Sequence, residues 1–109
     1  MANAYKVLGQ SAPSATTDTD IYTVPASTEA VISTVVVANR STSNATYRIA
    51  VRPDGATIAN QHYVAYDVTI PASDAISITI GITMDATDVL TVRASSADLS
   101  FSVFGSEIV

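Results

Sequence analysis

Apolar residues alternate with small polar residues along several stretches of this chain. Between residues 76 and 84, isoleucine or methionine occupies every second position, with Ser, Thr or Gly between them. This period of two places one kind of side chain on each face of a β-strand. Residues 47–52, 90–93 and 99–103 alternate in the same way, whereas 31–38 is nearly all apolar and β-branched, which is typical of a strand covered on both faces. Since no segment carries an apolar stripe at helical spacing, the sequence predicts an all-β protein.

Polar segments rich in turn-forming residues separate these runs. Pro53-Asp54-Gly55 places proline where φ is preset and glycine where a positive φ is tolerated, and similar breaks lie at residues 71–74 and 85–88. We therefore predict strands near residues 4–9, 20–24, 30–39, 45–52, 60–69, 75–84, 89–95 and 99–108. Seven or eight short strands at this spacing predict an antiparallel two-layer β-sandwich, of which the jelly roll is one form.

The alternation also predicts which side chains fill the sandwich. The expected inner-face residues are Val35, Val37, Ile49, Val51, Ile78, Ile80, Val92, Phe101 and Val103. Burial of an aliphatic side chain of this size contributes about 1.5–3 kcal/mol, so a charge at Ile80 is expected to unfold the domain.

Size and charge exclude several classes of function. The 109 residues fit one domain, and the lack of cysteine excludes a disulfide framework or a thiolate metal site and fits assembly in a reducing cytoplasm. The formal net charge is -5, with only five Lys plus Arg and no basic cluster, so neither nucleic acid nor an anionic membrane is an expected partner. The first residues do not resemble a signal peptide, and no apolar run approaches the roughly 20 residues of a membrane helix.

The composition favours a protein that contacts other proteins. Charged residues make up 14% of the chain and apolar residues 48%, whereas soluble domains carry roughly a quarter charged residues. The cores of protein interfaces are depleted of the same charged types. The alternative is a freely soluble β domain whose surface is rich in Ser and Thr.

The two ends of the chain are the main candidates for assembly contacts. Residues 10–19 are rich in Ser, Thr and Ala without periodicity, so we expect an N-terminal strand and linker arm at 1–19 and a β-sandwich domain at 20–109. The first strand could pair within its own sheet or add to the edge of a neighbouring subunit. The apolar C-terminus poses the same question. The candidate contact residues at the two ends are Tyr5, Lys6, Val7, Leu8, Phe104, Ile108 and Val109.

Tyr63 and Tyr66 are further candidates, because tyrosine combines an apolar ring with a polar tip and suits interfaces. Their odd spacing should send them to opposite faces of a strand unless a bulge intervenes. They could also form a saccharide platform, although the chain has no tryptophan to strengthen it.

No arrangement of residues predicts catalysis or a cofactor. His62 is the single histidine, and with no cysteine it cannot build a zinc site of the usual kind. Asp85 and Asp88 share one loop and could hold a calcium ion with backbone carbonyls, but such acids more often cap turns. We therefore expect no enzyme activity, no catalytic residue and no cofactor.

Several segments together resemble the small virion-associated β proteins of tailed bacteriophages, especially marine and cyanobacterial ones. The resemblance is carried by residues 21–26, 30–40, 47–51, 61–67 and 101–108. It implies a structural component of a virion assembled in the host cytoplasm, without fixing its place on the particle. Small size, low charge and two chain ends with candidate contact residues favour a capsid decoration or cement protein. Such a protein is expected to be a homo-oligomer, for example a trimer, and to bind the major capsid protein. The alternatives are a tail, baseplate, neck or fibre-associated protein, and a carbohydrate-binding module for host recognition.

Overall fold

The computed structural model describes residues 3–109 and contains eight strands and two short 3₁₀ turns. The strands are β1 (Asn3–Ser11), β2 (Thr19–Thr23), β3 (Glu29–Asn39), β4 (Ala45–Arg52), β5 (Tyr63–Ile70), β6 (Ala75–Met84), β7 (Val89–Ala94) and β8 (Leu99–Ile108), and the turns are η1 (Pro53–Gly55) and η2 (Asn60–His62). Each predicted strand is present. The largest difference lies at β5, because η2 occupies the positions where that strand was expected to begin.

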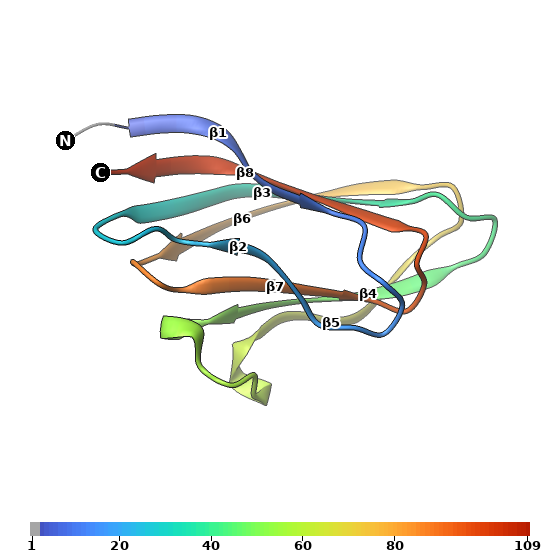
Figure 1. Ribbon diagram of the computed structural model, residues 1–109. Helices are drawn as coiled ribbons and strands as arrows, with labels where there is room; N and C mark the ends of the chain where they lie inside the picture. Colours follow the sequence, from blue (N-terminus) through green and yellow to red (C-terminus); the bar gives the residue numbers. More distant parts are fainter. Residues whose placement is uncertain (1–2) are drawn as a thin grey trace.

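The strands form two antiparallel four-stranded sheets that pack face to face (Figure 1), so the predicted two-layer β-sandwich is confirmed. One sheet has the order β1-β8-β3-β6 and is called the terminal sheet here, because it contains both terminal strands. The other, β2-β7-β4-β5, is called the internal sheet. Strands pair in a nested series, β4 with β5, β3 with β6, β2 with β7 and β1 with β8, which is a long hairpin rolled into two layers. This is the jelly-roll arrangement.

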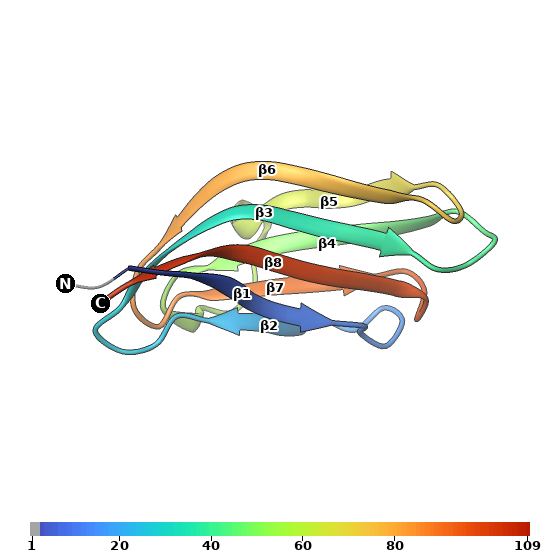
Figure 2. The same ribbon diagram turned by 90° about the horizontal axis from the view of Figure 1, so that it is seen from above.

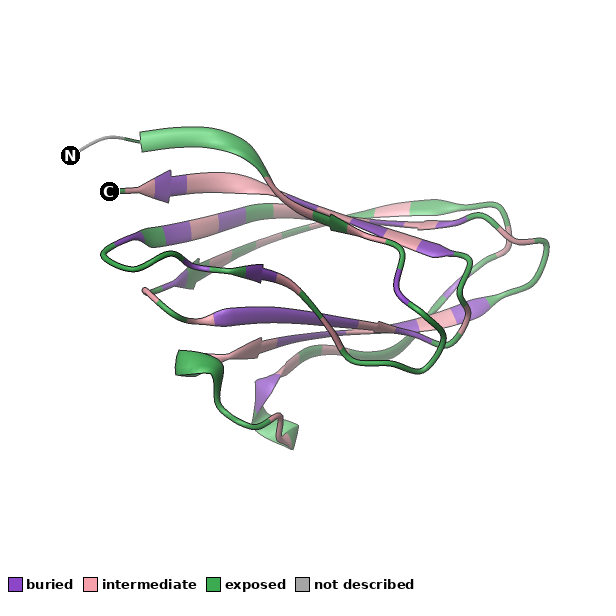
Figure 3. Ribbon diagram, in the orientation of Figure 1, coloured by how far each residue is buried: buried purple, intermediate pink, exposed green. Residues whose placement is uncertain are grey.

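The core lies between the two sheets, where buried positions alternate with exposed ones along the strands (Figure 3). Phe101 of the terminal sheet packs edge-on against Tyr47 of the internal sheet, with ring centroids 6.4 Å apart. Six of the nine predicted inner-face residues are fully buried, namely Val35, Val37, Ile49, Val92, Phe101 and Val103. Val51 and Ile78 are partly buried against them.

Ile80 is a wrong prediction of the alternating pattern. It is only half-buried and does not join the core cluster. The β3–β6 register pairs Ile32 with Ile82 but Thr34 with Thr79, so β6 uses one extra residue at this level. Gly81, at a φ of 60°, forms part of this bulge. Because the strand bends here at the open edge of the sheet, a charge at Ile80 is no longer expected to unfold the domain.

The N-terminal strand pairs within its own sheet. β1 runs antiparallel to β8, from Asn3 opposite Ile108 to Ser11 opposite Phe101, so the start of β1 lies beside the end of β8 (Figures 1 and 2). Gly9 comes so close to β2 that a Cβ atom there would lie 2.2 Å from the carbonyl oxygen of Ile21. This contact explains why glycine is required at this point.

The segment between β1 and β2 also lies on the sandwich. Pro13 is buried, and the backbone N–H of Thr16 donates to the carbonyl oxygen of Ala94 at 2.7 Å. Residues 1 and 2 of the predicted arm lie outside the described residues. The division into an arm at 1–19 and a body at 20–109 stays a prediction about folding units.

Candidate assembly surface and polar face

The pairing of β1 with β8 gathers the terminal candidate residues on the outer face of the terminal sheet. Tyr5 lies opposite Ser106 and Val7 opposite Phe104. Tyr5 is 83% exposed and Val7 48% exposed. Together with Val31 of β3 and the ring of Phe104, they line a shallow groove of about 580 Å³. We call this feature the terminal groove.

Phe104 faces outward because the alternation of β8 continues to the end of the strand. Leu99, Phe101 and Val103 point into the core, so the side chains of Phe104, Ser106 and Ile108 lie on the opposite face. Ile108 is half-buried, and Val109 is 67% exposed. Exposed apolar side chains that cluster in this way are typical of an interaction surface.

Two of the terminal candidates lie differently from the rest. Leu8 packs against the core. Lys6 borders the terminal groove, but its Nζ forms an ion pair with Oε1 of Glu107 at 2.6 Å. Neither side chain therefore adds to the apolar wall of the groove.

Glu107 is a buried acid that the sequence reasoning missed. It lies on the inner face of β8, where the hydroxyl of Tyr22 donates to its Oε2 at 2.5 Å. The Lys6 ammonium and this hydroxyl hold the pKa of Glu107 below its usual range, because both favour the charged carboxylate. Burial and the same carboxylate raise the pKa of Tyr22. The sequence does carry a signal for this burial, because Glu107 belongs to the same every-second-residue series as Phe101 and Val103.

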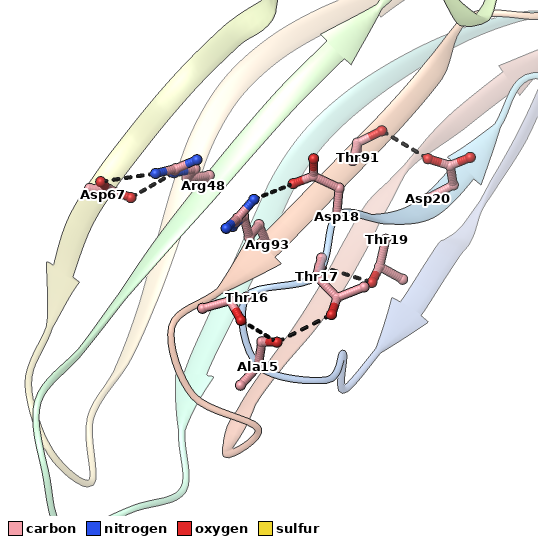
Figure 4. Close-up of polar contacts among 10 residues, drawn as sticks. All are labelled: Ala15, Thr16, Thr17, Asp18, Thr19, Asp20, Arg48, Asp67, Thr91 and Arg93. Atoms are coloured by element: carbon pink, nitrogen blue, oxygen red, sulfur yellow. Dashed lines mark hydrogen bonds and ion pairs between the residues drawn. The ribbon is translucent and has the colours of Figure 1, made fainter. Parts of the chain in front are cut away.

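The outer face of the internal sheet is charged. Its two central strands carry Arg48, Arg52 and Arg93, and the flanking segments supply one aspartate for each (Figure 4 shows two of these pairs). The ion pairs join Arg48 to Asp67 at 2.7 Å, Arg52 to Asp20 at 2.8 Å and Arg93 to Asp18 at 3.5 Å. Asp67 raises the pKa of Arg48 through its hydrogen bonds, and Arg48 in turn lowers the pKa of Asp67.

Tyr63 and Tyr66 lie on this charged face and on the same side of β5. Their rings are 4.8 Å apart in an edge-on arrangement, and the guanidinium of Arg48 lies 4.1 Å from the ring centroid of Tyr66. The β4–β5 register shifts twice in this region, and Asp67 has a φ of 51°. The bulge overrides the simple alternation that would have separated the two rings.

His62 and the loop acids have structural partners. His62 is buried in η2, where its Nδ1 accepts the backbone N–H of Ala59 at 3.0 Å. Both carboxylate oxygens of Asp88 accept backbone N–H groups, from Asp54 at 2.8 Å and from Asp85 at 2.9 Å. Asp85 caps its own turn by accepting the N–H of Ala86. Asp85 and Asp88 therefore cap turns, which was the alternative to a calcium site for these two residues.

Within residues 3–109, no cluster of three or more His, Asp or Glu side chains is placed to hold a metal ion. The same residues include no helix with the length and apolar character that a membrane crossing needs.

Comparisons of the chain with protein-family models, with curated proteins and with solved structures found no match. The geometry of the two outer faces therefore carries the functional argument.

Proposed function

We propose that this protein is a non-enzymatic structural component of a virion, and that it decorates and cements a capsid shell. The observation that carries the proposal is the terminal groove, where Tyr5, Val7 and Phe104 expose apolar surface on a sheet face with few charges. Burial of apolar surface is the dominant favourable contribution to most protein–protein association.

The charge distribution supports contact through this face. The four strands of the terminal sheet contain only Lys6, Glu29 and Glu107 as charged residues, and two of these neutralise each other. Association through the groove would therefore remove few charges from water. Desolvation of charges is the main cost of burying a polar surface, so this cost is small here. Tyrosine and phenylalanine are enriched in the cores of such interfaces.

The proposed mechanism is additive. One groove offers a small contact area, which alone corresponds to a weak interaction. Copies that associate with one another, for example as trimers, would present several grooves to the shell at once, and multivalent attachment raises the overall affinity without new contacts. The expected partner is the major capsid protein.

Mass spectrometry of purified particles tests this function. Decoration requires hundreds of copies of the chain per particle. A count of only a few copies would rule out decoration, and absence from the particle would overturn the virion role.

A variant pair tests the surface itself. Tyr5→Ser combined with Val7→Ser should sharply reduce incorporation into particles, because both changes remove apolar wall from the groove. Tyr66→Ser, which removes an exposed tyrosine from the internal sheet instead, should incorporate normally. Equal incorporation of both proteins would show that the groove is not the contact surface.

A position on the tail, baseplate, neck or fibre is the alternative within the same class, since the groove could equally bind a tail protein. Immunogold labelling of intact particles separates the two. Label over the head supports decoration, whereas label confined to the tail supports the alternative.

A further inference from the structure

Arg93 differs from the other cationic side chains in its polar contacts. Arg40, Arg48 and Arg52 each donate at least two hydrogen bonds, and Lys6 forms a close ion pair. Among the residues that the structure describes, Arg93 has no hydrogen-bond partner, and its nearest carboxylate oxygen, on Asp18, lies 3.5 Å away. The planar guanidinium fork of Arg93 is therefore available to an acceptor from outside the chain.

A second arginine lies beside it. Arg48 is the register partner of Arg93 across the β4–β7 pair. Like charges at directly opposed positions destabilise a sheet unless anions offset them. Asp67 accepts hydrogen bonds from the Nε and Nη2 groups of Arg48, so only part of this guanidinium is engaged by the aspartate.

Arg48, Arg93 and Asp67 all line one polar hollow, which we call the arginine hollow (Figure 4 labels these three side chains). Its volume is about 210 Å³, and Thr16, Thr46 and Ser95 contribute hydroxyl-bearing residues to its wall. Pockets that enclose a drug-sized ligand measure roughly 300–1,000 Å³. The hollow therefore suits a single small anionic group that belongs to a larger ligand resting on the surface.

An aromatic surface continues from the arginine hollow. Tyr66, which is 55% exposed, does not line the hollow itself, but its ring lies against the guanidinium of Arg48, and Tyr63 packs edge-on against that ring. A ligand held in the hollow would reach this ring with its next few atoms. Aromatic rings offer an apolar face, while Asp67 and the nearby hydroxyl groups offer hydrogen bonds.

We propose that the arginine hollow binds the acidic group of a saccharide, with the sugar ring resting against Tyr66. A carboxylate or sulfate oxygen pair matches the fork of Arg93 and the remaining donors of Arg48. Sugar hydroxyls match Asp67 and the threonine and serine side chains. A nucleic acid fits less well, because its phosphate chain needs several cations and the protein carries a net charge of -5. This site is independent of the capsid contact and lies on the opposite sheet.

Isothermal titration calorimetry with three probes tests the proposal on the full chain. The probes are a galacturonic acid trisaccharide, a sulfated galactan oligosaccharide of equal length and the neutral maltotriose. At least one acidic probe should bind, and maltotriose should not. The acidic probe that binds more tightly identifies carboxylate or sulfate as the preferred group. No heat from either acidic probe at millimolar concentration would overturn the proposal, as would equal binding of maltotriose.

Substitutions then locate the site. Arg93→Gln should weaken binding of the acidic probe by about tenfold or more, because it removes a charge-assisted fork. Arg93→Lys, which keeps the charge but loses the fork, should recover only part of the affinity. The matched control is Arg40→Gln, which makes the same charge change outside this face and should bind like the parent protein. Equal weakening by Arg40→Gln and Arg93→Gln would mean that the loss of affinity comes from the change in net charge alone, and the proposed site would be wrong.

Tyr66→Ala tests the aromatic contact separately. It should weaken binding several-fold while circular dichroism and the thermal transition of the protein stay unchanged. If Tyr66→Ala binds with full affinity, the placement of the sugar ring is wrong.

Discussion

The two sheets share one core but present opposite chemistry to their surroundings. On the terminal sheet the outer face is poor in charge and exposes Tyr5, Val7 and Phe104. On the internal sheet, arginines of the central strands pair with aspartates of the flanking segments. The difference indicates that the terminal sheet suits an apolar contact from which water is excluded, whereas the internal sheet suits a polar, hydrated contact.

The sheet edges differ as well. β5 carries Asp67 and two register shifts, and β2 is only five residues long. Charges, bulges and short length all protect an edge from pairing with another chain. β6 is ten residues long, carries no charge and relies on the bulge near Gly81. The more weakly protected edge thus belongs to the terminal sheet, in line with its proposed role in contacts.

The largest predicted effect concerns the core that both sheets share. Phe101→Ala should reduce the free energy of unfolding by about 3–5 kcal/mol, because it removes a buried ring that packs against Tyr47 of the other sheet. Phe104→Ala is the matched control on the same strand and should cost less than half as much, since Phe104 faces outward. Urea unfolding measures both. Equal losses would contradict the assignment of inner and outer faces on β8.

The second prediction concerns the buried acid. Glu107→Gln should lower the free energy of unfolding at pH 7 by about 1–3 kcal/mol, because it weakens contacts to Lys6 and Tyr22. The folded-state pKa of Glu107 is depressed, so its contribution is complete above the unfolded value of about 4.3 and is lost as the pH falls through the folded value. The difference between variant and parent should therefore shrink below about pH 4.3. A constant difference from pH 7 to pH 2 would show that ionisation of Glu107 does not contribute.

The third prediction concerns the charged face. Asp67→Asn should cause a small loss of stability at low ionic strength, because Arg48 loses an exposed ion pair. Added salt should bring the urea midpoints of variant and parent closer together, since salt screens exposed charges. The same salt series on the Tyr5→Ser variant should show no such convergence. A difference for Asp67→Asn that does not depend on salt would point to the backbone at this bulge instead.

The smallest effect is expected in the terminal groove. Tyr5→Ser combined with Val7→Ser should change the free energy of unfolding by no more than about 0.5 kcal/mol, because Tyr5 is largely exposed and Val7 about half exposed. Thermal or urea unfolding of the isolated protein measures this. A loss of several kcal/mol would mean that these residues stabilise the fold, which would remove the basis for assigning them to a contact.

The sequence was informative where each strand could be interpreted alone. The alternation in residues 99–103 correctly predicted the inner face of β8, and the strand bounds of β4, β6 and β8 needed no correction. Extending that alternation to residue 107 would also have predicted the buried glutamate.

Features that depend on two strands could not be predicted in the same way. Ile80 and the Tyr63–Tyr66 pair were both displaced by bulges, whose positions depend on the register with a neighbouring strand. The meeting of Tyr5 with Phe104, and of Arg48 with Arg93, follows from the order of strands in the sheets. A pattern of period two specifies the faces of a strand but not its neighbours.

The most direct test of the central claim is a cryo-EM map of the intact particle at side-chain resolution. Our account predicts many copies of the chain on the shell, with Tyr5, Val7 and Phe104 buried against a capsid or neighbouring subunit and the arginine hollow open to solvent. Copies that attach through the internal sheet, with the terminal groove facing solvent, would contradict it.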